Sequence, residues 1–160
     1  MRYLIDGYNL MYALGLVRRD GGRAGWDRAR RQMLDWLVDQ LGTAAGDVTI
    51  ALDAQSALPA PIVSESYRGL RLVRKPGRSA DDLIEDLLRD ESSPETLTVV
   101  SNDSRVRDAA ITNGCHAWRC SEYVDSLMKS SKSAVEIEPD EKDVQATPEE
   151  QAEWLKAFGD

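Results

Sequence analysis

Histidine and cysteine are scarce in this 160-residue sequence, which contains one histidine and two cysteines. A single histidine excludes a zinc site built on several histidines, and two cysteines do not make a disulfide framework. The group Cys115, His116 and Cys120 offers too few ligands for a tetrahedral structural zinc. We interpret these three residues as ordinary residues around a buried strand.

Long apolar runs and a surplus of positive charge are also missing. No stretch approaches the roughly 18 apolar residues that a membrane-spanning helix requires, and the amino terminus lacks the pattern of a signal peptide. We therefore expect a cytoplasmic protein that does not associate with membranes. The 28 acidic and 20 basic residues leave a net charge of −8, which argues against coating nucleic acid through bulk positive charge. An enzyme that holds a divalent cation with carboxylates remains compatible with this charge.

Short apolar runs alternate with helical patterns over residues 1–128. Because the runs are continuously apolar, they are typical of a mainly parallel sheet covered on both faces, and we predict a three-layer α/β fold. The sequence does not determine the order of the strands. The predicted strands are 3–5, 48–52, 70–73, 97–100 and 116–118, and the predicted helices are 26–41, 80–88, 104–112 and 121–128.

The composition changes after this region. Residues 129–160 hold nine acidic residues and four lysines, so −5 of the net charge lies there and −3 in the preceding body. We predict a flexible acidic linker at 129–146 and a short amphipathic helix at 147–160, which starts with a capping-box pattern. This C-terminal helix either packs on the domain or docks onto a protein partner or a second copy of the chain.

Aspartates stand where three of the predicted strands end: Asp6, Asp53 and Asp103. The carboxyl ends of parallel strands meet at one edge of a sheet, and the helix that starts with Asp81 and Asp82 begins at the same edge. Carboxylates that close repel one another unless a cation intervenes, and Mg²⁺ or Mn²⁺ prefers such oxygen ligands. Each aspartate taken alone is also explained as a turn former or a favourable helix-start charge.

Arginine supplies most of the positive charge of the body, where Lys75 is the one lysine among 16 basic residues. Arginine suits bidentate contacts with phosphate, although basic runs are also common on solvated faces. One basic group flanks the predicted strand 70–73 and consists of Arg68, Arg71, Arg74, Lys75 and Arg78.

The segment Tyr3-Leu4-Ile5-Asp6-Gly7-Tyr8-Asn9-Leu10 resembles the signature of NYN-domain ribonucleases, specifically the YacP-like branch of the PIN-like nucleases. The similarity continues in Leu52-Asp53-Ala54, in Ser79-Ala80-Asp81-Asp82 and in Val100-Ser101-Asn102-Asp103. It covers about residues 1–128 and does not include the acidic tail.

This resemblance implies a PIN-like fold and a metal-dependent endoribonuclease that cleaves single-stranded RNA. Members of this branch are associated with messenger RNA turnover on the ribosome, so a ribosome is an expected partner. Carried over by position, Asp6, Asp81 and Asp103 match the metal-binding carboxylates, and Asp53 is a further catalytic acid. A neighbour of Asp81 is an alternative ligand.

The expected chemistry is attack on the phosphodiester by water activated by Mg²⁺ or Mn²⁺, which leaves a 5′-phosphate and a 3′-hydroxyl. Two further sets of residues are expected to support it. Those expected to surround the metal ligands are Asn9, Asp82, Glu85, Ser101 and Asn102, and those expected to contact RNA are Tyr8 and the basic group Arg68, Arg71, Arg74, Lys75 and Arg78.

Two other functions compete with this hypothesis. The first is a non-catalytic adaptor with a PIN-like fold that binds RNA or the ribosome. The second is an aspartyl-nucleophile phosphatase, because Asp6 follows the first strand. Such phosphatases need a second acid two residues later, where this sequence has Tyr8, so the phosphatase is disfavoured.

Overall fold

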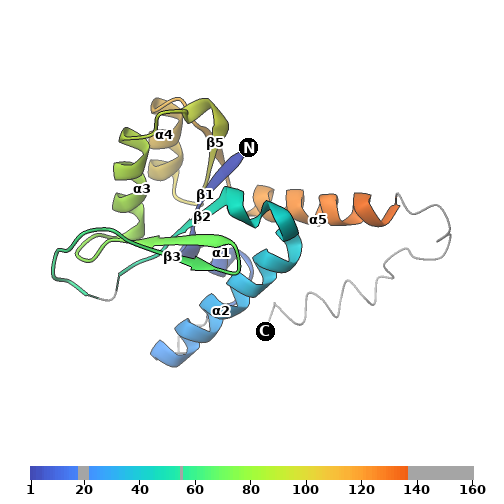
Figure 1. Cartoon of the computed structure of the whole chain (residues 1–160), viewed down its shortest axis with the longest axis horizontal. Coiled ribbons are helices and arrows are strands. Elements are labelled where there is room, and N and C mark those ends of the chain that lie inside the picture. The colour runs from blue at the N-terminus through green and yellow to red at the C-terminus, as the bar shows by residue number, and fades with distance from the viewer. Residues whose placement is uncertain (18–21, 55, 137–160) are drawn as a thin grey trace.

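The computed structural model describes residues 1–17, 22–54 and 56–136 (Figure 1). A six-stranded sheet forms its centre, in the order β3-β4-β2-β1-β5-β6. The pairs are parallel except for the antiparallel pair β3–β4, which confirms the predicted α/β fold with a mainly parallel sheet. The strands are β1 (Arg2–Asp6), β2 (Val48–Ala51), β3 (Val63–Tyr67), β4 (Leu70–Arg74), β5 (Leu97–Val100) and β6 (His116–Trp118).

Helices cover both faces of this sheet. Helices α1, α2 and α5 pack on one face, and α3 and α4 pack on the other (Figure 1). Neighbouring residues of a strand point to opposite faces, so Ile5 of β1 joins the first core cluster and Leu4 joins the second. The helices are α1 (Gly7–Ala13), α2 (Gly22–Leu41), α3 (Ala80–Arg89), α4 (Ser104–Thr112) and α5 (Cys120–Glu136), with short 3-10 helices at Gly42–Asp47 and Pro94–Thr96.

Three elements differ clearly from the prediction, and α2 also begins earlier than the predicted residue 26, at Gly22. Strand β3 was not predicted, because its three central residues are exposed on an edge strand and form no apolar run. Helix α1 was not predicted either, since it begins at a glycine directly after β1. Helix α5 continues past residue 128 to Glu136, so the first residues of the predicted linker are helical. The remainder of that linker and the predicted helix 147–160 lie outside the described residues.

The residues considered for zinc and for membrane insertion are also placed. Cys115 and Cys120 are buried free thiols, while His116 is exposed at the start of β6. Over the described ranges, no helix combines the length and the apolar character needed to span a membrane.

Candidate active site

The parallel register of the central strands brings three strand ends to one edge of the sheet. Asp6 pairs with Ala51 of β2, and its neighbour Ile5 pairs with Val100 of β5. Asp53 and Asp103 lie just beyond β2 and β5, so they reach the same edge as Asp6. The convergence of strand-end aspartates is therefore present in the structure.

A pocket of about 360 Å³ opens at this edge. Its lining contains all four aspartates that were predicted to be catalytic, and no arginine or lysine. The pocket therefore concentrates negative charge, although most of the nearby surface carries both signs. The lining residues are Asp6, Tyr8, Asn9, Asp53, Ser79, Ala80, Asp81, Asn102 and Asp103.

Three of these aspartates also form helix starts. The Oδ1 atom of Asp6 accepts a hydrogen bond from the Asn9 backbone at 3.3 Å, at the beginning of α1. Asp103 Oδ1 accepts one from the Arg105 backbone at 2.9 Å, at the beginning of α4. Asp53 accepts one at 2.7 Å from the first backbone N–H of α3. The positive ends of three helix dipoles thus face the pocket and reduce the repulsion among its carboxylates.

Gly7 allows α1 to start immediately after Asp6. A Cβ atom at this position would lie 2.7 Å from Leu52 Cδ2, 3.0 Å from Ile50 Cγ2 and 3.1 Å from the carbonyl oxygen of Ala51. Any larger residue would push α1 away from β2. This shift would also disturb the hydrogen bond through which Asp6 caps α1. The glycine of the Asp6-Gly7 pair is therefore required by packing.

Asp6 is buried, with 2% of its surface exposed, and is held by the side chain of Asn9. Asn9 Nδ2 donates to Asp6 Oδ2 at 2.7 Å and to Ser101 Oγ at 3.0 Å. Ser101 Oγ in turn accepts from the backbone N–H of Asp103 at 3.1 Å. This chain of hydrogen bonds ties the end of β1 to the end of β5 and fixes Asp6 relative to Asp103.

The carboxyl of Asp6 is strongly perturbed. Burial, followed by a hydrogen bond with Asp81, raises the pKa of Asp6 to about 7, and the negative charges of Asp81 and Asp53 add to this rise. The backbone N–H of Asn9 opposes it. Asp6 therefore holds a proton more readily than an ordinary carboxyl does.

The donors of the pocket suit a hard divalent cation. Within the described ranges, no three Asp, Glu, His or Cys side chains lie close enough to form a complete metal site. Mg²⁺ does not need such a cage, because it retains several waters and is usually bound through one or two carboxylates and substrate phosphates. The lining supplies carboxylates from Asp6, Asp53, Asp81 and Asp103, and such oxygen donors fit Mg²⁺ or Mn²⁺.

Asn102 has a second task that was not predicted. Its Oδ1 atom accepts a hydrogen bond from the Cys120 backbone at 3.1 Å, so it caps the start of α5 while lining the pocket. The prediction had placed it only among the residues expected to surround the metal ligands. The distant partner in α5 gave no local signal in the sequence.

Residues 3–157 match the sequence profile of the YacP-like NYN domain. The chain belongs to the YacP-like NYN family. NYN domains are nuclease-like, and members of this family are generally ribonucleases. The matched region extends beyond residue 128, so it includes most of the acidic tail that we expected to lie outside the similarity.

Two solved structures share the fold of this YacP-like domain. The crystal structure of the W164L mutant of Rae1 (YacP) from Bacillus subtilis has a TM-score of 0.61 and 21% identity, covering 99% of this chain and 92% of that chain. A second crystal structure of Rae1 (YacP) from Bacillus subtilis has a TM-score of 0.60 and 18% identity over the same shares. At these identities the likeness establishes the fold. No curated protein matches the chain.

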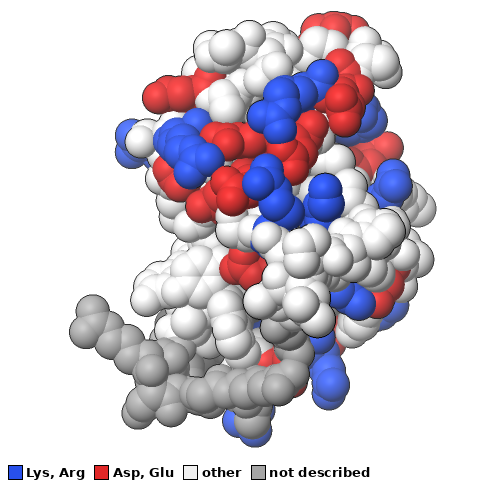
Figure 2. Space-filling model, turned by 90° about the vertical axis from the view of Figure 1, so that its left-hand side faces the viewer, with Lys and Arg blue, Asp and Glu red and all other residues white. Residues whose placement is uncertain are grey.

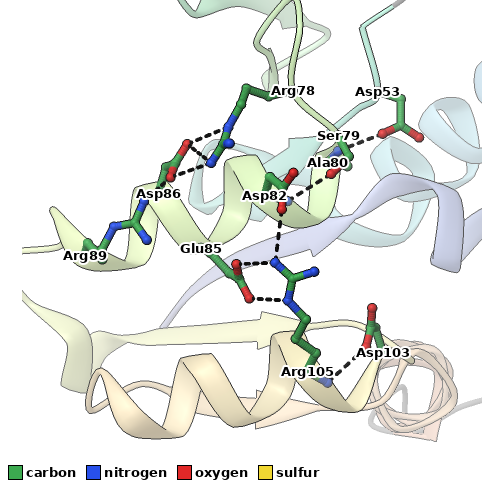
Figure 3. A network of polar contacts seen from close by, with 10 residues as sticks. All are labelled: Asp53, Arg78, Ser79, Ala80, Asp82, Glu85, Asp86, Arg89, Asp103 and Arg105. Carbon is green, nitrogen blue, oxygen red and sulfur yellow. Dashed lines mark hydrogen bonds and ion pairs between the residues drawn. The ribbon is translucent and has the colours of Figure 1, made fainter.

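Asp82 and Glu85 do not line the pocket of this YacP-like domain, and both point toward Arg105 (Figure 3). The guanidinium of Arg105 donates to Glu85 at 2.9 and 2.7 Å and to Asp82 at 3.1 Å. Both acids therefore join α3 to α4, close to the cap that Asp103 forms. Arg105 was not predicted, because its pairing depends on the packing of two helices and its one sequence signal is its place just after Asp103.

The arginines predicted to bind RNA are not gathered around the pocket. Arg68 lies in the β3–β4 turn, at the end of β4 remote from the pocket, and pairs with Asp35 at 3.2 Å. The others that form contacts also do so outside the pocket: Arg71 donates to Ser64, Arg74 pairs with Glu65 and Arg78 pairs with Asp86. Figure 2 shows such basic and acidic side chains in contact on one face of the molecule. Of the residues predicted to contact RNA, Tyr8 lines the pocket.

Proposed function

We propose that this chain is a divalent-metal-dependent endoribonuclease that cleaves single-stranded RNA, with messenger RNA on the ribosome as its substrate. The observation that carries the proposal is the pocket at the carboxyl edge of the sheet, where four aspartates converge and no basic residue lines the wall. Membership of a family of nuclease-like domains supports the same reaction class.

Each pocket residue has a role in this proposal. Asp6, Asp81 and Asp103 would supply the carboxylates for Mg²⁺ or Mn²⁺, and Asp53 would act as a further acid at the site. When bound, the divalent cation supplies Lewis-acid chemistry that activates water and neutralises charge on the phosphate. Asn9 orients the Asp6 carboxylate, and Ser101 fixes the loop that presents Asp103.

The reaction is a phosphodiester hydrolysis. The oxygen of water bonds to phosphorus, and the bond from phosphorus to the 3′ oxygen breaks, which leaves a 5′-phosphate and a 3′-hydroxyl. A bound cation would favour the charged form of Asp6, whose pKa is raised by burial. The pocket is open to solvent at the sheet edge, as an extended single strand requires.

The test is cleavage of a fluorescently labelled single-stranded RNA with Mn²⁺. The Asp6→Asn and Asp103→Asn proteins are expected to lose cleavage while they remain folded by circular dichroism. Asp108→Asn is a matched control, because Asp108 is an exposed aspartate of α4 outside the pocket. Cleavage at the wild-type rate by both pocket variants would overturn the proposal.

A specific observation also favours the adaptor hypothesis as a second candidate. The carboxylate of Asp103 is engaged by the backbone of Arg105, and the described residues contain no assembled group of three metal ligands. An adaptor would bind RNA without Mn²⁺ and without turnover. Calorimetry with Mn²⁺ alongside the cleavage assay separates the two, since a nuclease shows metal binding and product, and the adaptor shows neither.

A further inference from the structure

The exposed aromatic side chains among the described residues gather in one place. Tyr8, Tyr12 and Trp26 are 39%, 49% and 37% exposed, and the other aromatic residues described are half-buried or buried. The ring centroid of Tyr8 lies 4.9 Å from that of Trp26 and 5.3 Å from that of Tyr12. We call these three residues the aromatic cluster.

The aromatic cluster is continuous with the acidic pocket. Tyr8 lines the pocket, and it stands on α1 just after the Asp6 cap. Tyr12 lies one helical turn further along the same face of α1, and Trp26 reaches the cluster from α2. The three rings therefore form a surface that starts at the pocket and leads away from it.

The packing of α1 onto the core does not depend on these three exposed rings. Helix α1 is anchored to the core through Leu10 and Met11, which are buried in the cluster that also contains residues of α2. The rings of the aromatic cluster contact one another at the surface, where apolar area remains in water. Contiguous exposed apolar surface of this kind marks interaction sites.

We propose that Tyr8, Tyr12 and Trp26 form a base-stacking platform that binds the nucleobases of single-stranded RNA beside the acidic pocket. The nature of this ligand rests on the proposed nuclease function. Every nucleobase has a π face, so aromatic rings hold single-stranded bases without reading their sequence. Bases inside a duplex are already stacked and are not available to such a surface.

The charges of the chain favour stacking as a source of RNA affinity. The net charge is −8, and Arg68, Arg74 and Arg78 are each paired with an acidic residue. Because these three arginines are already paired with acids, they contribute less to the binding of phosphates. Stacking supplies affinity that does not depend on positive charge, so RNA binding is expected to be only weakly sensitive to salt.

The test measures binding of a short fluorescent RNA in EDTA, so that cleavage plays no part. Tyr12→Leu and Trp26→Leu are each expected to weaken binding by about five- to a hundredfold. Trp26→Phe retains a ring and is expected to bind close to the wild-type affinity. Ile111→Ala, at an apolar residue of α4 that is 63% exposed, is the control for loss of exposed apolar surface, and thermal unfolding checks that every variant is folded.

A second RNA, in which abasic sites replace the central bases, identifies the contact. The wild-type protein is expected to bind it less tightly than the intact RNA, whereas Trp26→Leu should distinguish the two RNAs far less. If the wild-type protein cleaves RNA but the leucine variants bind it normally, the platform is wrong and the nuclease stands. If RNA binding depends on the rings but no cleavage occurs with any divalent ion, the platform stands and the nuclease is wrong. Failure of the wild-type protein to bind single-stranded RNA overturns the platform.

Discussion

Helix α3 has acidic residues on two faces. The acids of one face lie among other acids, and those of the other face lie among arginines. On the pocket face, Asp81 meets the carboxyl of Asp6, and no basic side chain lines the wall. On the other face, acids and arginines alternate (Figure 3). The pairs there are Asp82 and Glu85 with Arg105, and Asp86 with Arg78 and Arg89.

This contrast separates structural acids from functional ones. Exposed ion pairs contribute little to stability. They do neutralise the acidic residues on this face of α3. The hydrogen bonds from Arg105 to Glu85 and Asp82 raise the pKa of the Arg105 guanidinium, so this group stays charged at any pH at which the protein is folded. Buried acids without a cation destabilise a fold, and natural proteins retain them mainly where chemistry needs them. The pocket face is therefore the one expected to act on substrate.

The largest expected effect tests this contrast along a single helix. Asp81→Asn should lower the rate of RNA cleavage with Mn²⁺ by on the order of a hundredfold or more, because it removes a proposed metal ligand. Asp86→Asn removes an equal charge from the paired face and should change the rate by less than about threefold. Rates are measured under single-turnover conditions with saturating Mn²⁺.

Asp82→Asn decides which residue at the start of α3 is the ligand. We expect a loss smaller than that of Asp81→Asn, since Asp82 is bound to Arg105 and does not line the pocket. A larger loss for Asp82→Asn than for Asp81→Asn would transfer the ligand role to Asp82, the alternative that the sequence left open.

The next effect is on stability and depends on pH. The raised pKa of Asp6, about 7 against 3.8 for the ordinary carboxyl, means that the folded state binds this proton more tightly than the unfolded chain. That stabilisation is complete below about pH 4 and is lost as the pH rises through about 7. In EDTA at pH 8, the melting temperature of Asp6→Asn should therefore be several degrees above that of wild type, because the variant has no buried charge at this position. At pH 5 the difference in melting temperature should be smaller.

Two measurements accompany this thermal scan. Addition of Mn²⁺ at pH 8 should raise the melting temperature of wild type and not that of Asp6→Asn. Asp86→Asn should melt at or slightly below wild type at both pH values, because its carboxylate is paired with arginine. A melting temperature for Asp6→Asn below wild type by the same amount at pH 5 and pH 8 would show that Asp6 carries no unfavourable charge.

A smaller effect concerns the backbone that supports the pocket face. Gly7→Ala should lower the free energy of unfolding by about 1–3 kcal/mol, because its Cβ atom overlaps the β2 strand. Gly25 of α2 is the matched control, since a Cβ atom there meets nothing within 4 Å. Gly25→Ala should stabilise the protein by about 0.5–1 kcal/mol. Urea unfolding of both variants checks this opposite sign, and a loss at both positions would mean that crowding is not the cause at Gly7.

The predictable parts of the fold are those that a single local pattern in the sequence identifies. Central strands such as β1 and β5 are buried on both faces, so they read as apolar runs that end at an aspartate. Strand β3 escapes this signal, because its sequence Val63–Tyr67 is mostly exposed and is defined by pairing with β4. Helix α1 was missed because Asp6 both ends β1 and caps the helix, so no turn separates the two elements.

The site was predictable where it depends on strand ends, and not where it depends on contacts between helices. Carboxylates at strand ends must meet in a parallel sheet, and the structure brings Asp6, Asp53 and Asp103 to one pocket. The partners of Arg105 and the contact between Tyr8 and Trp26 depend on which helices are neighbours. Such contacts join residues far apart in the chain, and no local pattern in the sequence indicates them.

The smallest expected effect compares the two ends of β4. Lys75 follows the end of β4 that lies beside the pocket, and no ion pair of Lys75 occurs among the described residues. Arg68 stands at the other end and is paired with Asp35. Lys75→Ala should reduce the slope of log K for single-stranded RNA against log salt by about 0.7, the value of one phosphate contact.

Arg68→Ala should leave that slope unchanged, because its guanidinium is remote from the pocket. Binding titrations in EDTA at several salt concentrations measure both slopes. An equal change for the two variants would mean that RNA crosses the whole face of the β3–β4 hairpin. A change for Lys75→Ala alone would confine the phosphate backbone to the pocket edge, beside Asp6 and Asp81.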